Sequence, residues 1–169
     1  MVASSGEINC TSTTVTLDGS GSSTGNNISY DWQDANGNNI GTGTTLTVSN
    51  AGTYTLIITN GQNGCVSQAT ETVFSNNIIP IASIAAPNEL TCALGTITID
   101  GSASSSGSNI SYNWTDLNRN SLGTNNTLDV FSGGDYQLMV TDNSNGCTCL
   151  LYTSPSPRDA TLSRMPSSA

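Results

Sequence analysis

Residues 10–65 and 92–147 are two copies of one segment, 82 positions apart and aligned without a gap. Of the 56 aligned positions, 29 are identical, and the identities are clustered, as where 15–20 matches 97–102. A repeat of this length is too long for a solenoid unit that needs its neighbours to fold, and it suits a small independent domain. We therefore expect two tandem domains, residues 1–76 and 77–148, the first of them beginning partway along its first strand.

The charge composition excludes several classes of partner. The chain has 12 acidic residues, three basic residues and no histidine, which gives a formal net charge of -9. Proteins that bind nucleic acids concentrate Lys and Arg, and so do proteins that bind anionic membrane surfaces. The sequence also has no apolar run near the roughly 20 residues that span a bilayer. We expect neither a nucleic-acid partner nor membrane insertion of this segment.

The last 21 residues, 149–169, differ from the rest of the chain, because they hold three of its five prolines and two of its three basic residues. The stretch 150–159 resembles the read-through translation of a sequencing-library adapter. We therefore expect 149–169 to be a non-native tail, which belongs outside any fold argument. The last strand of the second domain should begin just past Cys147. The prediction is that this strand is missing and that 150–153 either occupies its edge by chance or leaves the edge open.

The cysteines recur with the repeat. Cys10 and Cys65 are 55 positions apart, and so are Cys92 and Cys147. With one pair in each copy, we predict two disulfides, one within each domain, and therefore an oxidising, extracellular compartment. Closing such a loop stabilises a domain by roughly 4 kcal/mol in the chain-entropy model. The alternative is four free buried thiols in a cytosolic protein.

Period-2 alternation of apolar and polar residues predicts strands at 15–18, 28–33, 45–48, 53–59 and 66–74, with equivalents in the second copy. Turn-forming residues at 34–38 predict a hairpin turn after the second of these strands. About seven short strands in each copy predict an all-β fold of two tandem Greek-key β-sandwiches. The predicted core residues are two indoles and two corner phenols: Trp32, Tyr54, Trp114 and Tyr136.

A family resemblance rests on a small set of residues: Cys92, Ile97–Ser102, Tyr112, Trp114, Gly123, Gly134, Tyr136 and Asn145–Cys147. Over nearly all of 2–148 the chain resembles the PKD-like and immunoglobulin-like repeats of large bacterial surface adhesins, including gliding-associated ones. The Trp-Asp-Phe-Gly-Asp-Gly core typical of PKD domains is not intact at 32–37. The resemblance implies an immunoglobulin/PKD-like sandwich in each copy and a place at the cell surface.

Catalytic residue types are scarce. The chain has no His, no Lys and, before the tail, one Arg, so most general bases and covalent amine nucleophiles are absent. We expect no enzymatic activity and no cofactor. Oxygen donors at alternating positions of a tight loop are weak candidates for a calcium site, and they are also ordinary turn formers. They are Asp34, Asn36, Asn38, Asp116, Asn118 and Asn120.

Taken together, these features predict a structural or adhesive repeat segment of an extracellular bacterial surface protein, acting as a spacer stalk or a cell-adhesion module. Its expected partners are neighbouring repeats of the same chain, with a surface glycan or a protein as a further ligand. The alternative is a glycan-binding accessory module of a secreted enzyme. Glycan binding predicts exposed aromatic side chains along one sheet face, whereas a stalk predicts aromatic residues that are buried at equivalent places in both copies.

Overall fold

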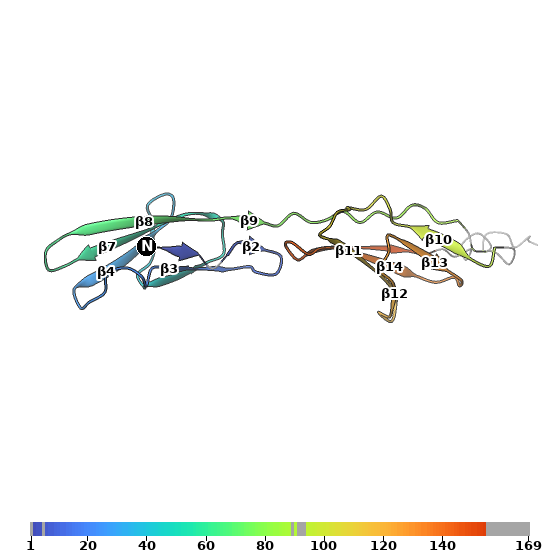
Figure 1. Ribbon diagram of the computed structural model, residues 1–169, viewed down its shortest axis with the longest axis horizontal. Helices are drawn as coiled ribbons and strands as arrows, with labels where there is room; N and C mark the ends of the chain where they lie inside the picture. Colours follow the sequence, from blue (N-terminus) through green and yellow to red (C-terminus); the bar gives the residue numbers. More distant parts are fainter. Residues whose placement is uncertain (1, 5, 89, 91–93, 155–169) are drawn as a thin grey trace, which may run out of the picture. The chain divides into compact units, whose positions relative to one another are not determined.

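The computed structural model of the chain describes residues 2–4, 6–88, 90 and 94–154, and its regular structure is entirely β-strand. The chain divides into two compact units, Met1–Ile78 and Ile79–Ala169 (Figure 1). In the described part, no helix is long and apolar enough to cross a bilayer.

The first unit is a sandwich of two sheets with a short additional strand pair. One sheet has the order β1-β3-β6, from β1 (Ala3–Ser4), β3 (Val15–Asp18) and β6 (Thr45–Val48). The other has the order β5-β4-β7-β8, from β5 (Asn39–Gly41), β4 (Ile28–Gln33), β7 (Gly52–Asn60) and β8 (Val66–Val73). The additional pair, β2 (Ile8–Asn9) and β9 (Ser75–Asn76), is parallel.

The second unit repeats this plan. A four-stranded sheet has the order β12-β11-β14-β15, from β12 (Ser121–Gly123), β11 (Ile110–Asp116), β14 (Tyr136–Asp142) and β15 (Cys147–Thr153). A two-stranded sheet pairs β10 (Ile97–Asp100) with β13 (Thr127–Val130). The predicted all-β, immunoglobulin-like fold is confirmed. The strands predicted in the first copy match β3, β4 and β6 and differ from β7 and β8 by at most one residue at either end.

Each core is built around one tryptophan. Trp32 on β4 and Trp114 on β11 are fully buried, and each indole N–H donates a hydrogen bond to a backbone carbonyl, at 2.8 Å to Gly43 and 2.9 Å to Asn125. This bond satisfies the one polar group of a buried indole. The indoles lie in these positions because the alternation of β4 and β11 directs every second side chain into the sandwich.

The corner tyrosines are also equivalent in the two units. Tyr54 begins the inward-facing series of β7, and its hydroxyl donates to the carbonyl of Asn50 at 2.7 Å. Tyr136 begins β14 and donates to the carbonyl of Ser132 at the same distance. Both side chains are buried. The bond ties the loop that enters the strand to the strand itself, as in the tyrosine corner of immunoglobulin-like folds.

The last strand of the second unit is present, so the prediction that it is missing is wrong. β15 pairs with β14 over seven positions, from Asp142↔Cys147 to Tyr136↔Thr153. Of the two outcomes predicted for 150–153, the structure shows the first, a segment that occupies the edge. The reason is that strand pairing uses backbone groups, and 147–153 needs only alternating side chains and no proline to supply them.

Candidate functional site

The predicted bridge between Cys10 and Cys65 is wrong, because Cys65 carries a free thiol and is exposed. Cys10 is nevertheless disulfide-bonded, and so is Cys147. The other member of the second predicted pair, Cys92, lies outside the described residues, so that pairing stays a prediction.

Distance within the first unit explains the error. Cys10 follows β2, whose Asn9 pairs with Asn76 at the far end of β9. Cys65 precedes β8, and β8 and β9 continue one another along the sandwich (Figure 1). Ten residues separate position 65 from the start of β9, or roughly 30 Å of extended chain at about 3.3 Å per residue. A disulfide needs Cα atoms within about 7 Å of each other, so the two cysteines of this unit lie at opposite ends and cannot meet.

The calcium candidates of the first unit form a closed turn. The Asp34 carboxylate accepts the N–H of Asn36, the N–H of Asn38 and the side-chain amide of Asn38, each at 2.9 Å. The Asn38 amide is the largest cause of a lowered pKa for Asp34, followed by the Asn38 N–H. Both carboxylate oxygens therefore already accept hydrogen bonds from the loop itself. Gly37 has a φ of 80°, the left-handed conformation expected of this turn.

The second unit has the same turn with another residue in the left-handed position. Asn120 donates both its N–H and its side-chain amide to Asp116, at 2.9 and 2.8 Å, and these bonds lower the pKa of Asp116. The place of Gly37 is taken by Arg119, with a φ of 65°. Within the described part of the chain, no three His, Cys, Asp or Glu residues come together as a metal site would require. The six candidates, Asn118 among them, thus lie in closed turns, and the calcium site itself stays a prediction.

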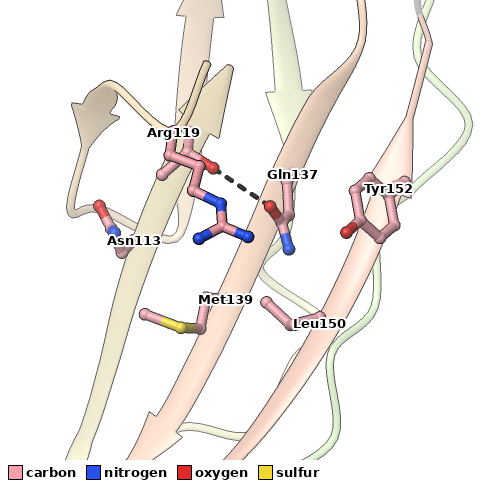
Figure 2. Close-up of a pocket in the computed structure, with 7 residues that line it drawn as sticks. Asn113, Arg119, Gln137, Met139, Leu150 and Tyr152 are labelled. Atoms are coloured by element: carbon pink, nitrogen blue, oxygen red, sulfur yellow. Dashed lines mark hydrogen bonds between the residues drawn. The ribbon is translucent and has the colours of Figure 1, made fainter. Parts of the chain in front are cut away.

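A shallow pocket lies on the outer face of the four-stranded sheet of the second unit (Figure 2). It has a volume of about 370 Å³ and is lined by side chains of β11, β14, β15 and the turn after β11. They are Asn113, Thr115, Arg119, Gln137, Met139, Leu150 and Tyr152. The sequence does not predict this pocket, since two of its residues, Leu150 and Tyr152, belong to the segment 149–169 that we expect to be a non-native tail.

The side chains that line this pocket offer amides, a guanidinium and an aromatic ring that could contact a ligand, but no acid–base pair. The guanidinium of Arg119 extends over the sheet between Asn113 and Gln137, and Tyr152 stands at the opposite wall (Figure 2). Thr115 donates to the Gln137 side-chain oxygen at 3.4 Å. The first unit lacks the pocket wall formed by Leu150 and Tyr152 of β15. At the equivalent positions of β8 it has Gln68 and Thr70. The pocket is therefore a feature of one unit and not of the repeat.

No protein-family model and no curated protein matches the chain. Among solved structures, it is similar to the BSP domain of a biofilm-associated protein, with 21% identity, a TM-score of 0.31, and 88% of this chain and 28% of that one covered. It is similar to a chimeric titin Z1Z2 tandem, with 12% identity, a TM-score of 0.31, and coverage of 83% and 87%. Domains 7, 8 and 9 of the S-layer protein SbsC share 13% identity at a TM-score of 0.30, with coverage of 86% and 56%. The chain thus spans about a quarter of the first of these structures and just over half of the third.

Proposed function

We propose that this chain is a structural repeat segment of an extracellular bacterial surface protein, of the PKD-like or immunoglobulin-like type, acting as a spacer stalk or adhesion module. The observation that carries the proposal is the equivalence of the buried aromatic residues. Trp32 and Trp114, like Tyr54 and Tyr136, are buried at corresponding places and donate to corresponding carbonyls. These aromatics are used for packing in both copies and are not displayed for a ligand.

The cysteines support the extracellular part of the proposal. Disulfides persist in oxidising surroundings, and both Cys10 and Cys147 are disulfide-bonded. The acidic, polar composition, with only 9% charged residues, also suits a surface that must stay soluble without binding polyanions.

The mechanical role rests on the ladders between neighbouring strands. In the first unit β7 pairs with β8 at eight positions, and in the second β14 pairs with β11 and with β15 at seven positions each. A force that separates these strands must break backbone hydrogen bonds and expose the core behind them at the same time. Each unit is expected to resist extension as one cooperative element.

Single-molecule force spectroscopy on the full chain tests this proposal. Under reducing conditions we expect two unfolding events per molecule, one for each unit. The Leu138→Ala variant, which removes a fully buried side chain of the second core, should weaken one event and leave the other unchanged. Extension without resolved force peaks would rule out a load-bearing role.

The glycan-binding alternative has one observation in its favour, the pocket lined by Asn113, Arg119 and Gln137. Its 63% exposed aromatic residue, Tyr152, belongs to the segment expected to be a non-native tail. The alternative is tested by following backbone amide resonances of Asn113 and Gln137 during titration with soluble oligosaccharides. Our proposal predicts no saturable shifts. Saturable shifts that disappear in Tyr152→Ala, with Tyr30→Phe as a control away from the pocket, would replace the stalk by a glycan-recognition module.

A further inference from the structure

The sequence contains four Asn-Gly pairs, at 36–37, 60–61, 63–64 and 145–146. Glycine has no side chain to shield its backbone nitrogen, so this nitrogen can attack the side-chain carbonyl carbon of the asparagine before it. The attack has two requirements. The glycine N–H must leave its hydrogen bond, and the asparagine side chain must turn toward the nitrogen. The fold therefore decides how reactive each pair is.

In three of the pairs, 60–61, 63–64 and 145–146, both groups are held by hydrogen bonds. The glycine N–H donates to a backbone carbonyl, at 2.7, 2.7 and 2.8 Å in chain order. The asparagine side-chain oxygen accepts the N–H two residues further on, at 2.9, 3.0 and 2.9 Å. Asn145 is also buried, with 1% of its surface exposed. At these three pairs the attack must first break two hydrogen bonds.

The fourth pair, 36–37, is held less firmly. The Gly37 N–H donates to the Asp34 carbonyl at 3.0 Å, the longest of the four glycine bonds. The Asn36 side chain is exposed, and its oxygen accepts no hydrogen bond from the residues that the structure describes. Among the groups that lower the pKa of Asp34, the Asn38 amide comes first and the Asn36 amide last. Asn36 therefore needs the smallest local opening to bring its carbonyl carbon to the attacking nitrogen.

The equivalent turn of the second unit carries a different pair, Asn118 and Arg119. Arg119 has nearly the same left-handed backbone as Gly37, with φ values of 65° and 80°. The Arg119 side chain branches from the carbon next to the nitrogen that would have to attack, so it hinders ring closure. One turn conformation thus occurs with a reactive pair in the first unit and with a hindered pair in the second.

We propose that Asn36 is a site of spontaneous covalent modification, where the Gly37 nitrogen closes a succinimide ring that water then opens to aspartate or isoaspartate. The nitrogen loses its proton and bonds to the side-chain carbonyl carbon of Asn36. The C–N bond to the side-chain amide breaks, and the amide nitrogen leaves with that proton as ammonia. Water then adds to either carbonyl of the ring and breaks one of its C–N bonds, which leaves a carboxylate. The reaction needs only water and does not depend on the proposed function.

The product changes the first unit alone. A new carboxylate at position 36 lies two residues from Asp34, whose own carboxylate accepts the Asn36 N–H at 2.9 Å. Like charges this close destabilise the turn that holds them. Isoaspartate also adds a carbon to the backbone before Gly37, which displaces the N–H that Asp34 accepts. We expect the turn between β4 and β5 to loosen as the modification accumulates.

The test follows all four pairs in the full chain during incubation in mildly alkaline buffer, by digestion with pepsin in acid and mass spectrometry of the peptides. In the folded chain, position 36 should convert roughly five times as fast as any other pair, because each of the others must break about one more hydrogen bond. In denaturant the four pairs should convert at similar rates, since the fold no longer distinguishes them. Incubation in H₂¹⁸O should place ¹⁸O in the new carboxylate.

Two variants exchange the residue after the asparagine between the units. Gly37→Arg, which introduces the residue of the second copy, should suppress conversion at position 36 and leave the pair 63–64 unchanged. Arg119→Gly should make Asn118 convert. Folding of each variant is checked by the two indole N–H resonances, one from each unit.

Three results would overturn the proposal. The first is faster conversion at position 60, 63 or 145 than at position 36 in the folded chain. The second is an equal preference for position 36 with and without denaturant, which would make the sequence and not the fold its cause. The third is an unreactive Asn118 in the folded Arg119→Gly variant.

Discussion

Gly101, which follows β10, lies where the backbone passes close to the indole of Trp114, and we predict that Gly101→Ala destabilises the second unit alone. A methyl group at this position would lie 2.8 Å from the Asn126 carbonyl oxygen, 2.9 Å from Cδ2 of Leu138 and 3.1 Å from Cζ2 of Trp114. The carbonyl is held in place, because it accepts the N–H of Gly101 at 2.9 Å. The two side chains are fully buried, so a methyl group added here must displace atoms inside the core.

The magnitude follows from two opposing effects. Overpacking of a well-packed core costs about 1–3 kcal/mol. Replacing glycine by alanine also restricts the unfolded chain, which offsets about 0.4–1 kcal/mol of that cost. Taking the middle of each range, the net loss is about 1.3 kcal/mol, or roughly a tenfold rise in the unfolding equilibrium constant of this unit.

Urea denaturation followed by NMR measures this effect in each unit separately, because the chain has two tryptophans and each core contains one. With a denaturant dependence of about 1–2 kcal/mol per M for a domain this small, the midpoint of the Trp114 resonance should fall by about 1 M. The Trp32 midpoint should not change. The matched control is Gly95→Ala, where a methyl group meets nothing within 4 Å and the first copy carries Thr13. Equal midpoints for Gly101→Ala and Gly95→Ala would refute the close-packing argument.

Four further outcomes are expected. Tyr54→Phe and Tyr136→Phe should each lower the free energy of unfolding of their own unit by about 1 kcal/mol, since each loses one buried hydrogen bond; an effect on the other unit would contradict this. Leu138→Ala should cost the second unit about 2–5 kcal/mol by leaving a cavity, and a smaller loss than for Gly101→Ala would be inconsistent with full burial. The lowered pKa of Asp34 favours the folded state above its ordinary value of 3.8, and this contribution is lost as pH falls through the folded-state pKa. Asp34→Asn should therefore weaken the decline of stability in acid, and an unchanged urea midpoint profile between pH 5 and about pH 2 would contradict the assignment. Millimolar calcium should leave the melting temperature unchanged, because the carboxylates of Asp34 and Asp116 already accept hydrogen bonds from their own turns, and a rise reversed by a chelator would establish a calcium site there.

Much of the fold could be predicted from the sequence, because strands and turns have local causes and because the two units repeat one segment. Alternation over 15–18 and 28–33 predicts β3 and β4, since side chains of a strand point to opposite faces whatever the rest of the chain does. The positive φ of Gly37 follows from the turn that 34–38 must make. The pocket beside Tyr152 could not be predicted, because it depends on which side chains of three different strands share an outer face.

The sequence by itself determined that two equivalent units exist and that each folds around a tryptophan and a corner tyrosine, because these follow from a repeat and from short-range periodicity. Only the tertiary structure decided how the cysteines are used and whether 147–153 forms a strand. A spacing of 55 positions between Cys10 and Cys65 does not fix their distance in space, and the fold places them at opposite ends of one sandwich. The edge of β14 in turn accepts any extended segment that offers backbone hydrogen bonds and alternating side chains, whatever its origin.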